Sequence, residues 1–403
     1  MRKVNLPSLP EWQAPAKRET IELQLRLITP MFGGGYKARE VDTVQPIRPA
    51  AIRGHLRFWW RATAGARYTS VADLHKAETE LWGGASKKDN PAVGKVAIQV
   101  QILSAGEETP YSQVAPPSKP EDGPLHGYFL FPFREQREQN IPAAVGRKQV
   151  RFQLRLTLDA SLSEAQRAEV RTALKAWIAF GGVGARTRRG CGALTVVGAN
   201  ANQWLPPTRG LAQWLGMPEH TASNHRWTTL AGARGVIMPV QSTQDAWREL
   251  GQFWARFRKG HFPQNYSPMT GSKWRDYRQV LCQLRSQGNT LRLAKPFLGL
   301  PIVYQKFGKQ TPFTGTLEPA ESGRMASPVI LKPIALQGGK YGALVLVMNA
   351  PKPNRIQIDG KEYTLAAPTK DPVLQALGAN DVLDAVLKGA KQHFGQRSVS
   401  FDL

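Results

Sequence analysis

Hydrophobic residues alternate with polar ones along several short stretches in the first half of the chain. In residues 20–29, the positions Ile21, Leu23, Leu25 and Leu27 share one side, with polar residues between them. This period of two is the pattern of a half-buried strand. Similar strands are predicted at 96–102, 150–158 and 194–197.

Helical patterns separate these strands. One helix is predicted from Pro49 to about Ala66, and two more begin at Ser70 and Ser163 and end before glycine pairs. Proline suits a first helical turn, serine suits an N-cap and glycine suits a helix end. The order strand, helix, strand, strand, helix, strand is ferredoxin-like, with residues 106–119 and 134–146 as insertions.

The pattern restarts after residues 204–207. Strands are predicted at 236–240, 329–336 and 343–348, and helices at 245–258, 274–285 and 373–394. We therefore predict an α+β protein with two ferredoxin-like (βαββαβ) domains carrying loop insertions. The first domain would span residues 1–205 and the second residues 206–403.

The charge of the chain indicates what kind of partner it binds. The 403 residues include 54 Lys and Arg but 30 Asp and Glu, a formal net charge of +24. Residues 43–72, 170–218 and 277–317 contain no acid but carry many Arg and Lys residues. Such an imbalance favours a polyanionic partner, either nucleic acid or an anionic membrane surface.

Nucleic acid is the better of the two. No window approaches the roughly 18 apolar residues of a membrane-spanning helix, and residues 1–19 lack the apolar core of a signal peptide. Cys191 and Cys282 make neither a disulfide framework nor a zinc site. The sequence thus predicts a cytoplasmic protein without a metal or cofactor.

The helix at 49–66 carries an arginine stripe. Arg53, Arg57 and Arg61 are spaced to stack on one face, and no acid lies between residues 43 and 72. We expect three unpaired guanidinium groups that bind phosphate, so Arg57→Glu should weaken RNA binding without unfolding the protein. Capping of carbonyls or pairing with a distant acid remains the structural alternative. Trp59 and Trp60 are expected in the core.

Two glycine-rich segments accompany the stripe. Residues 181–192 combine glycines with arginines and could cradle an oxygen anion, although they match neither a Walker A loop nor a dinucleotide fingerprint. A flexible surface loop is the alternative. In the other segment, Gly33, Gly34 and Gly35 lie between Phe32 and Tyr36, two aromatic residues that could stack on bases.

Catalytic groupings are sparse. The seven histidines are scattered, and none has metal-ligand spacing with a nearby carboxylate. His55 lies within the arginine helix and could act as a general base on a ribose 2′-hydroxyl, although a structural role is the better interpretation. The sequence does not argue for an enzyme.

These motifs resemble a known family. The segment Ile52–Arg61 is similar to the signature helix of the first subunit of the type III-B CRISPR (Cmr) effector complex, within the RAMP superfamily of ferredoxin-like RNA-binding proteins. Residues 29–34 and 181–192 resemble the family's loop after the first strand and its G-rich loop. Residues 324–328 and 331–333 resemble a later family element, which adds Arg324 and Lys332 to the candidates.

The resemblance implies a non-catalytic subunit of a ribonucleoprotein in antiviral defence. It would bind the 3′ region of the guide RNA or the guide–target duplex and contact other RAMP subunits. The predicted RNA-binding residues are Phe32, Gly33, Gly34, Gly35, Arg53, Arg57, Arg61, Gly182, Gly184, Arg186, Arg188, Arg189, Arg324 and Lys332.

Two other functions stay open. A metal-independent endoribonuclease that processes guide precursor would need His55 as its base. A scaffold that binds only proteins would leave the charge of +24 unexplained.

Overall fold

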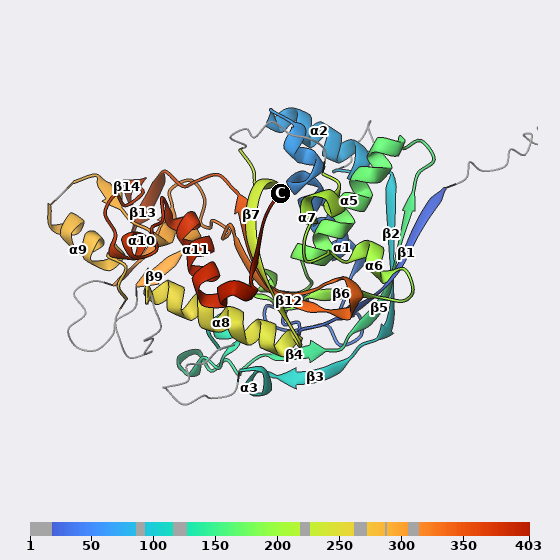
Figure 1. Ribbon diagram of the computed structural model, residues 1–403, viewed down its shortest axis with the longest axis horizontal. Helices are drawn as coiled ribbons and strands as arrows, with labels where there is room; N and C mark the ends of the chain where they lie inside the picture. The colour runs from blue at the N-terminus through green and yellow to red at the C-terminus, as the bar shows by residue number, and fades with distance from the viewer. Residues whose placement is uncertain are drawn as a thin grey trace, which may run out of the picture.

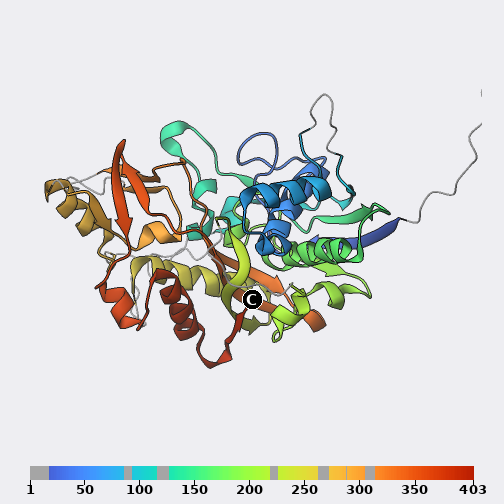
Figure 2. The same ribbon diagram turned by 90° about the horizontal axis from the view of Figure 1, so that it is seen from above.

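A computed structural model describes residues 18–85, 93–115, 127–217, 226–261, 272–286, 288–304 and 314–403. Residues 1–17 and residues 116–119 of the first predicted insertion lie outside these ranges. The molecule is elongated, with two modules side by side along its longest axis (Figures 1 and 2). The strands of the two main sheets fall within residues 19–197 for the first module and 229–402 for the second.

The first module is built on an antiparallel sheet in the order β2-β5-β1-β6. Its strands are β1 (Glu19–Leu27), β2 (Val96–Ser104), β5 (Arg151–Leu158) and β6 (Leu194–Val197). Helix α1 (Pro49–Ala62) follows the first of these strands and α5 (Glu164–Phe180) follows the third. This arrangement confirms the predicted ferredoxin-like order.

Local sequence signals set the helix ends of this module. Ser70 accepts a hydrogen bond from Asp73 N (3.1 Å) at the start of α2 (Val71–Trp82), and Gly83 ends that helix with a φ of 83°. Ser163 and Gln166 form a reciprocal capping box at the start of α5. The first predicted helix is shorter than expected, because α1 ends at Ala62 and a 3₁₀ turn, η1 (Ala64–Arg67), follows.

The second module repeats the design. Its main sheet has the order β11-β12-β7-β15 and comprises β7 (Thr229–Val240), β11 (Val329–Ala335), β12 (Tyr341–Asn349) and β15 (Val399–Asp402). Helix α8 (Thr243–Lys259) follows its first strand and α11 (Val382–Phe394) its third. The second βαββαβ unit is therefore present, including a last strand that the sequence patterns did not predict.

Insertions enlarge both modules. Between β2 and β5, β3 (Glu107–Pro110) pairs with β4 (Val145–Lys148), and the short helices α3 (Tyr111–Val114) and α4 (Gly127–Leu130) join them. The second module carries a five-stranded sheet in the order β8-β14-β13-β10-β9, at the end far from the first module (Figures 1 and 2). Its elements are β8 (Thr290–Arg292), β9 (Ile302–Tyr304), β10 (Gly315–Pro319), β13 (Arg355–Ile358), β14 (Lys361–Ala366), α9 (Asp276–Ser286) and α10 (Pro372–Ala376).

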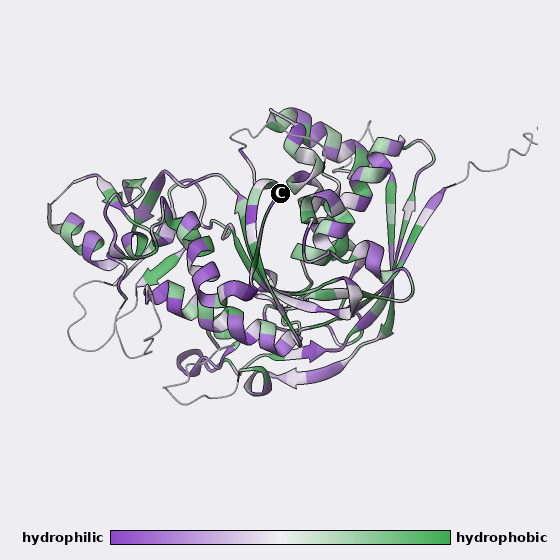
Figure 3. Ribbon diagram, in the orientation of Figure 1, coloured by the Kyte–Doolittle hydropathy of each residue, from purple (hydrophilic) through white to green (hydrophobic). Residues whose placement is uncertain are grey.

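One sheet joins the two modules. Ile237, Ile330 and Leu344 point from the second module's main sheet into a core that also contains the buried residues of α1 and α5. The alternate residues of the same strands, such as Val236 and Val345, pack with α8. Helix α8 shows the matching amphipathic banding along the outside of the molecule (Figure 3). The sheet is thus buried on both faces, and α6 (Ala201–Trp204) and α7 (Leu211–Leu215) connect the modules.

Candidate nucleic-acid interface

The arginine stripe of α1 is not free. Arg57 and Arg61 both pair with Glu78, at 2.6 and 2.5 Å, and Arg53 donates to the carbonyl of Trp82 at 2.9 Å. Arg57 also reaches the carbonyl of Gly83. The expectation of three unpaired cations is therefore wrong. Glu78 lies on α2, outside the acid-free stretch, and its side chain is almost fully buried. The stripe fastens α1 to the C-terminal end of α2, where basic groups also suit the helix dipole.

The tryptophans of α1 lie in the core, as predicted. Trp59 and Trp60 are buried, and the Trp60 indole donates to Glu169 at 2.9 Å. His55 is half-buried and stacks on Trp177, with ring centroids 6.2 Å apart. Burial lowers the pKa of His55, so the imidazole is neutral at pH 7.

The two glycine segments pack on each other. Ala185 N donates to the carbonyl of Phe32 at 2.8 Å. A Cβ on Gly34 would lie 3.2 Å from Gly184 Cα, and one on Gly184 would lie 2.8 Å from the Phe32 carbonyl oxygen. Both glycines have positive φ. Their small size therefore serves loop-to-loop contact in this structure.

The remaining glycines of the prediction are also confined by neighbouring atoms. Gly33 has a φ of 62°, and an added Cβ there would meet Ala185. On Gly35 and Gly182 a Cβ would lie 2.9 Å from the Glu40 carbonyl oxygen and 2.8 Å from that of Gly192.

The aromatic residues beside the first glycine segment differ sharply. Phe32 is fully buried and stacks on Phe133, with centroids 4.9 Å apart, so it cannot touch a base in this structure. Tyr36 is 84% exposed and remains accessible.

The arginines of the G-rich loop have three different surroundings. Arg186 donates to the carbonyl of Phe129 at 3.0 Å. Arg189 donates to the carbonyl of Val329 (2.7 Å) and to Ser327 Oγ (3.2 Å), which ties the loop to the second module. Arg188 is half-buried with its guanidinium 5.6 Å from the Phe58 ring centre. Within the described ranges, no hydrogen bond or ion pair engages the Arg188 side chain.

The two candidate RNA-binding residues of the second module differ in burial. Lys332 is fully buried, and its Nζ donates to the carbonyls of Gly181 (2.7 Å) and Ile178 (3.4 Å) at the end of α5. Burial lowers the pKa of Lys332 to about 7. No phosphate can reach this amine in the present structure. Arg324 is exposed in the loop before β11.

A pocket of about 460 Å³ forms where these elements meet. We call it the junction pocket. Helix α1 contributes His55 and Phe58, the G-rich loop contributes Arg188, and the second module contributes Ser327. The other lining residues are Trp59, Phe180, Gly181, Gly182, Arg186, Thr187, Arg189, Ala326 and Ile330.

The structure therefore brings together only part of the predicted site. The three G-rich-loop arginines share the junction pocket, whereas Arg53, Arg57 and Arg61 do not line it. Phe58, a pocket residue that the sequence argument passed over, lies one position after Arg57 on α1. The missed partner Glu78 follows Leu74 at helical spacing on α2, which could have indicated a side chain turned inward.

Residues 24–195 match the family model described as the RAMP superfamily. That match begins in β1 and ends in β6, so it covers the whole first ferredoxin-like sheet. This segment is therefore similar to proteins of the RAMP superfamily. The resemblance noted in the sequence is confirmed for this part of the chain. No curated protein matches the chain.

Solved structures with similar folds include Cmr1 from Pyrococcus furiosus in its apo form. That match has 16% identity and a TM-score of 0.48 and covers 83% of this chain and 89% of that one. A chain of the type III-B Cmr-β complex bound to cognate target RNA matches with 11% identity and a TM-score of 0.49, over 94% of this chain and 100% of that one.

Among the residues that the structure describes, none of the helices has the length and apolar character of a membrane span. The same residues hold no group of three or more His, Cys, Asp or Glu side chains suited to a metal ion.

Proposed function

We propose that this protein is a member of the RAMP superfamily and an RNA-binding subunit of a type III-B CRISPR (Cmr) effector complex. It would hold the 3′ region of the guide RNA, or the guide–target duplex, through phosphate contacts and would not cut RNA. Other RAMP subunits of the complex would be its protein partners. Support comes from the match to the RAMP superfamily, the signature-like helix Ile52–Arg61 and the net charge of +24.

The single observation that carries the proposal is Arg188 in the junction pocket. Its guanidinium is half-buried over the Phe58 ring, and this burial lowers its pKa. A desolvated cation is costly unless an anion or several acceptors satisfy it. The neighbouring arginines Arg186 and Arg189 add positive potential at the same wall. A phosphate is the anion that matches a guanidinium fork best.

The pocket also suits backbone recognition rather than base reading. Its polar lining comprises the hydroxyl groups of Thr187 and Ser327 beside the three arginines, and it holds no amide side chain that could read a base edge. Such groups position RNA through phosphate and sugar without selecting a sequence. This property fits a guide complex, in which base pairing supplies the sequence information.

The test is RNA binding by the full chain across a salt series, with Arg188→Ala compared with the wild type. We expect about tenfold weaker binding or more, since a charge-assisted contact contributes roughly 1.5–3 kcal/mol. The slope of log affinity against log salt should fall by about 0.7 for single-stranded RNA. Arg209→Ala is the matched control, because Arg209 is exposed and lines no pocket described here.

Equal losses in both variants would show that only the overall charge matters. Unchanged affinity in Arg188→Ala would overturn the proposed site.

Endonucleolytic cleavage is the second candidate, because His55 lines the same pocket in its neutral form. Neutral imidazole is the form that a general base requires. Among the described lining residues, however, there is no carboxylate, lysine or second histidine to act as the general acid. Intact labelled repeat RNA after incubation in EDTA would support a binding role, whereas cleavage that His55→Ala abolishes would support the nuclease.

A further inference from the structure

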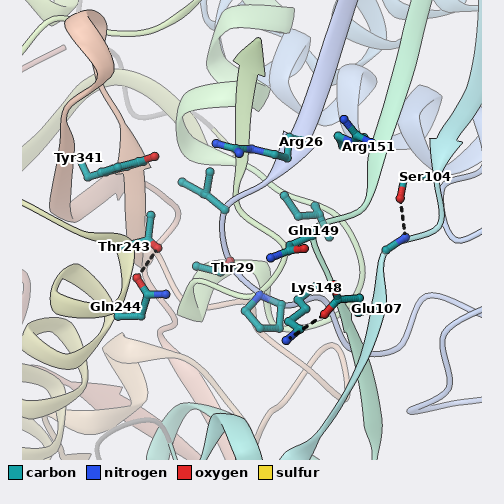
Figure 4. A pocket seen from close by; sticks show the side chains of 14 residues that line it. Arg26, Thr29, Ser104, Glu107, Lys148, Gln149, Arg151, Thr243, Gln244 and Tyr341 are labelled. Atoms are coloured by element: carbon teal, nitrogen blue, oxygen red, sulfur yellow. Dashed lines mark hydrogen bonds and ion pairs between the residues drawn. The ribbon is translucent and has the colours of Figure 1, made fainter.

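A second pocket, of about 630 Å³, also has walls from both modules. We call it the sheet-end pocket. It is lined by the ends of β1 and β5, the turn between β2 and β3, the start of α8 and the start of β12 (Figure 4). It shares no lining residue with the junction pocket. Its size falls within the range of about 300–1,000 Å³ that small-molecule sites occupy.

Two arginines lie side by side in its lining (Figure 4). Arg26 on β1 is in direct register with Arg151 on β5. Cross-strand neighbours of this kind lie about 5 Å apart at Cβ, and like charges placed so are destabilising. No hydrogen bond or ion pair engages either side chain within the described part of the chain, and Arg26 Nε is a buried atom without a partner. The sheet therefore holds two adjacent cations without an anion.

The rest of the same sheet face is neutralised, which makes this pair unusual. Four residues along β5, Arg155 pairs with Glu22 at 2.7 Å. Glu22 also accepts from Gln153 at 3.1 Å. Arg155 on this face therefore has an acidic partner. Arg26 and Arg151, at the end of the face that lines the pocket, have none among the described residues.

The walls formed by α8 and β12 supply groups that suit a ligand with an anionic group and a ring. The first turn of α8 contributes Thr243 and Gln244, and the first N–H groups of a helix lack intrahelical acceptors and favour negative charge. Asp245 in that turn is already paired with Arg248 at 3.1 Å. Tyr341 extends from β12 toward the guanidinium of Arg26 (Figure 4).

The floor of the pocket is held in a constrained conformation. Gln149 has a φ of 59°, and its amide points into the pocket (Figure 4). A Cβ on Gly106 would lie 2.1 Å from the carbonyl oxygen of Lys148, so the turn below the pocket requires glycine. Lys148 is the third cation of the lining and pairs with Glu107 at 3.2 Å. The three cations face one acid, which leaves the pocket positive.

We propose that the sheet-end pocket binds a nucleoside phosphate, with the phosphate between Arg26 and Arg151 and the base against Tyr341. The amides of Gln149 and Gln244 can then hydrogen-bond polar edges of the base. The ligand is either a free mononucleotide or one nucleotide of an RNA strand. Because the two pockets have no residue in common, this proposal can fail while the function of the junction pocket stands, and the reverse.

The first measurement is calorimetric titration of the full chain with AMP, inorganic phosphate and a short RNA oligonucleotide at low salt. Arg151→Ala should weaken AMP binding by about tenfold or more. Arg155→Ala is the matched control, since it removes the same side chain from the same strand outside the pocket, and it should leave AMP binding unchanged. Tyr341→Ala should weaken AMP binding but not phosphate binding.

The variant Arg151→Glu distinguishes a loss of AMP binding from a loss of stability. The new carboxylate would face Arg26, so the variant should melt no lower than the wild type, yet it should lose AMP binding. If AMP does not bind but the oligonucleotide binds less tightly to Arg151→Ala than to Arg155→Ala, the site takes its nucleotide within a strand. The proposal is overturned if neither ligand distinguishes these two variants, or if Arg151→Glu still binds AMP. If AMP does not bind, a loss of RNA binding confined to Arg188→Ala would likewise overturn it and leave the junction pocket intact.

Discussion

Glu78 is shared by two arginines from a different helix, and this arrangement decides what the stripe of α1 does. Its carboxylate is nearly inaccessible, while the side chains of Arg57 and Arg61 are 30% and 33% exposed. A buried acid depends on its cations, because removing one partner leaves charge uncompensated in a poorly solvated place. The stripe thus contributes to folding first.

We therefore expect Arg57→Glu to destabilise the protein. The new carboxylate would face Glu78, and the cost should be about 2–3 kcal/mol, below the value for a fully buried pair because Arg57 is partly exposed. Denaturant unfolding measures it. Arg292→Glu, at an exposed position on β8, is the control and should change stability little. Weaker RNA binding at unchanged stability would instead restore the interpretation that the sequence alone suggested.

Lys332 gives the protein a pH dependence of its own. Burial holds its pKa near 7 in the folded state, well below the ordinary value of 10.5, so the unfolded state binds more protons between these values. Stability should accordingly rise with pH from about 7 to 10 and stay at its lower level below pH 7, with a slope of at most about 1.4 kcal/mol per pH unit.

The check on Lys332 is a comparison of unfolding free energies for wild type and Lys332→Met between pH 6 and pH 10. The difference between the two curves isolates this one amine from the other lysines. Parallel curves would contradict the expectation and show that the amine stays charged at the carbonyls of Gly181 and Ile178.

At the scale of helices and strands, the sequence correctly predicted the features that local residue patterns determine. The alternation at residues 20–29, the serine caps and the glycine stops all correspond to observed strand or helix ends. The first ferredoxin-like sheet follows from these patterns, and so does the second apart from its last strand, β15. Two of the strands that escaped prediction, β10 and β14, have five and six residues. The others are short: β8 and β9 have three residues each, and β3, β4, β13 and β15 have four. A pattern with a period of two cannot be recognised over so few positions.

One missed hairpin had a usable signal. Asp359 and Gly360 separate β13 from β14, and both have positive φ, at 47° and 85°. An Asp-Gly pair between alternating segments is a strong indication of a two-residue hairpin turn. The pairing of β13 with β14 could thus have been predicted, whereas the parallel pairing of β14 with β8 depends on contacts distant in sequence.

The candidate site depends even more than the strands on contacts between residues that are distant in sequence. Sequence spacing placed Arg53, Arg57 and Arg61 on one helix face correctly, but the partner that neutralises two of them comes from α2. Arg188 and Arg189 are neighbours in sequence, yet one bonds to the second module and the other faces a pocket. Tertiary contacts, which a linear pattern does not contain, make that difference.

At the scale of the whole molecule, the two modules share one core. Ile330 of β11 packs with the buried residues of α1 and α5, and the Trp247 indole on α8 donates to the carbonyl of Arg189 at 2.9 Å. Arg189 in turn donates to Val329. Interfaces that are apolar and continuous with the module cores make relative movement of domains unfavourable.

We therefore expect the two modules to unfold together. Thermal unfolding followed by tryptophan fluorescence and by far-ultraviolet circular dichroism should give one coincident transition, because loss of either module exposes the buried face of β7, β11 and β12. Fragments 1–205 and 206–403, the predicted domains, should each be unstable or aggregate when expressed alone. Mixing or co-expressing them should restore the fold, and with it the junction pocket whose walls come from both modules.

Two separate transitions, or a monomeric folded fragment 206–403, would show that the modules are independent. In that case Arg188 could move relative to Ser327 and Ala326, and the junction pocket would be an arrangement that RNA has to select. A single transition means that the arginine is held in place before RNA arrives. Such preorganisation reduces the entropy lost on binding.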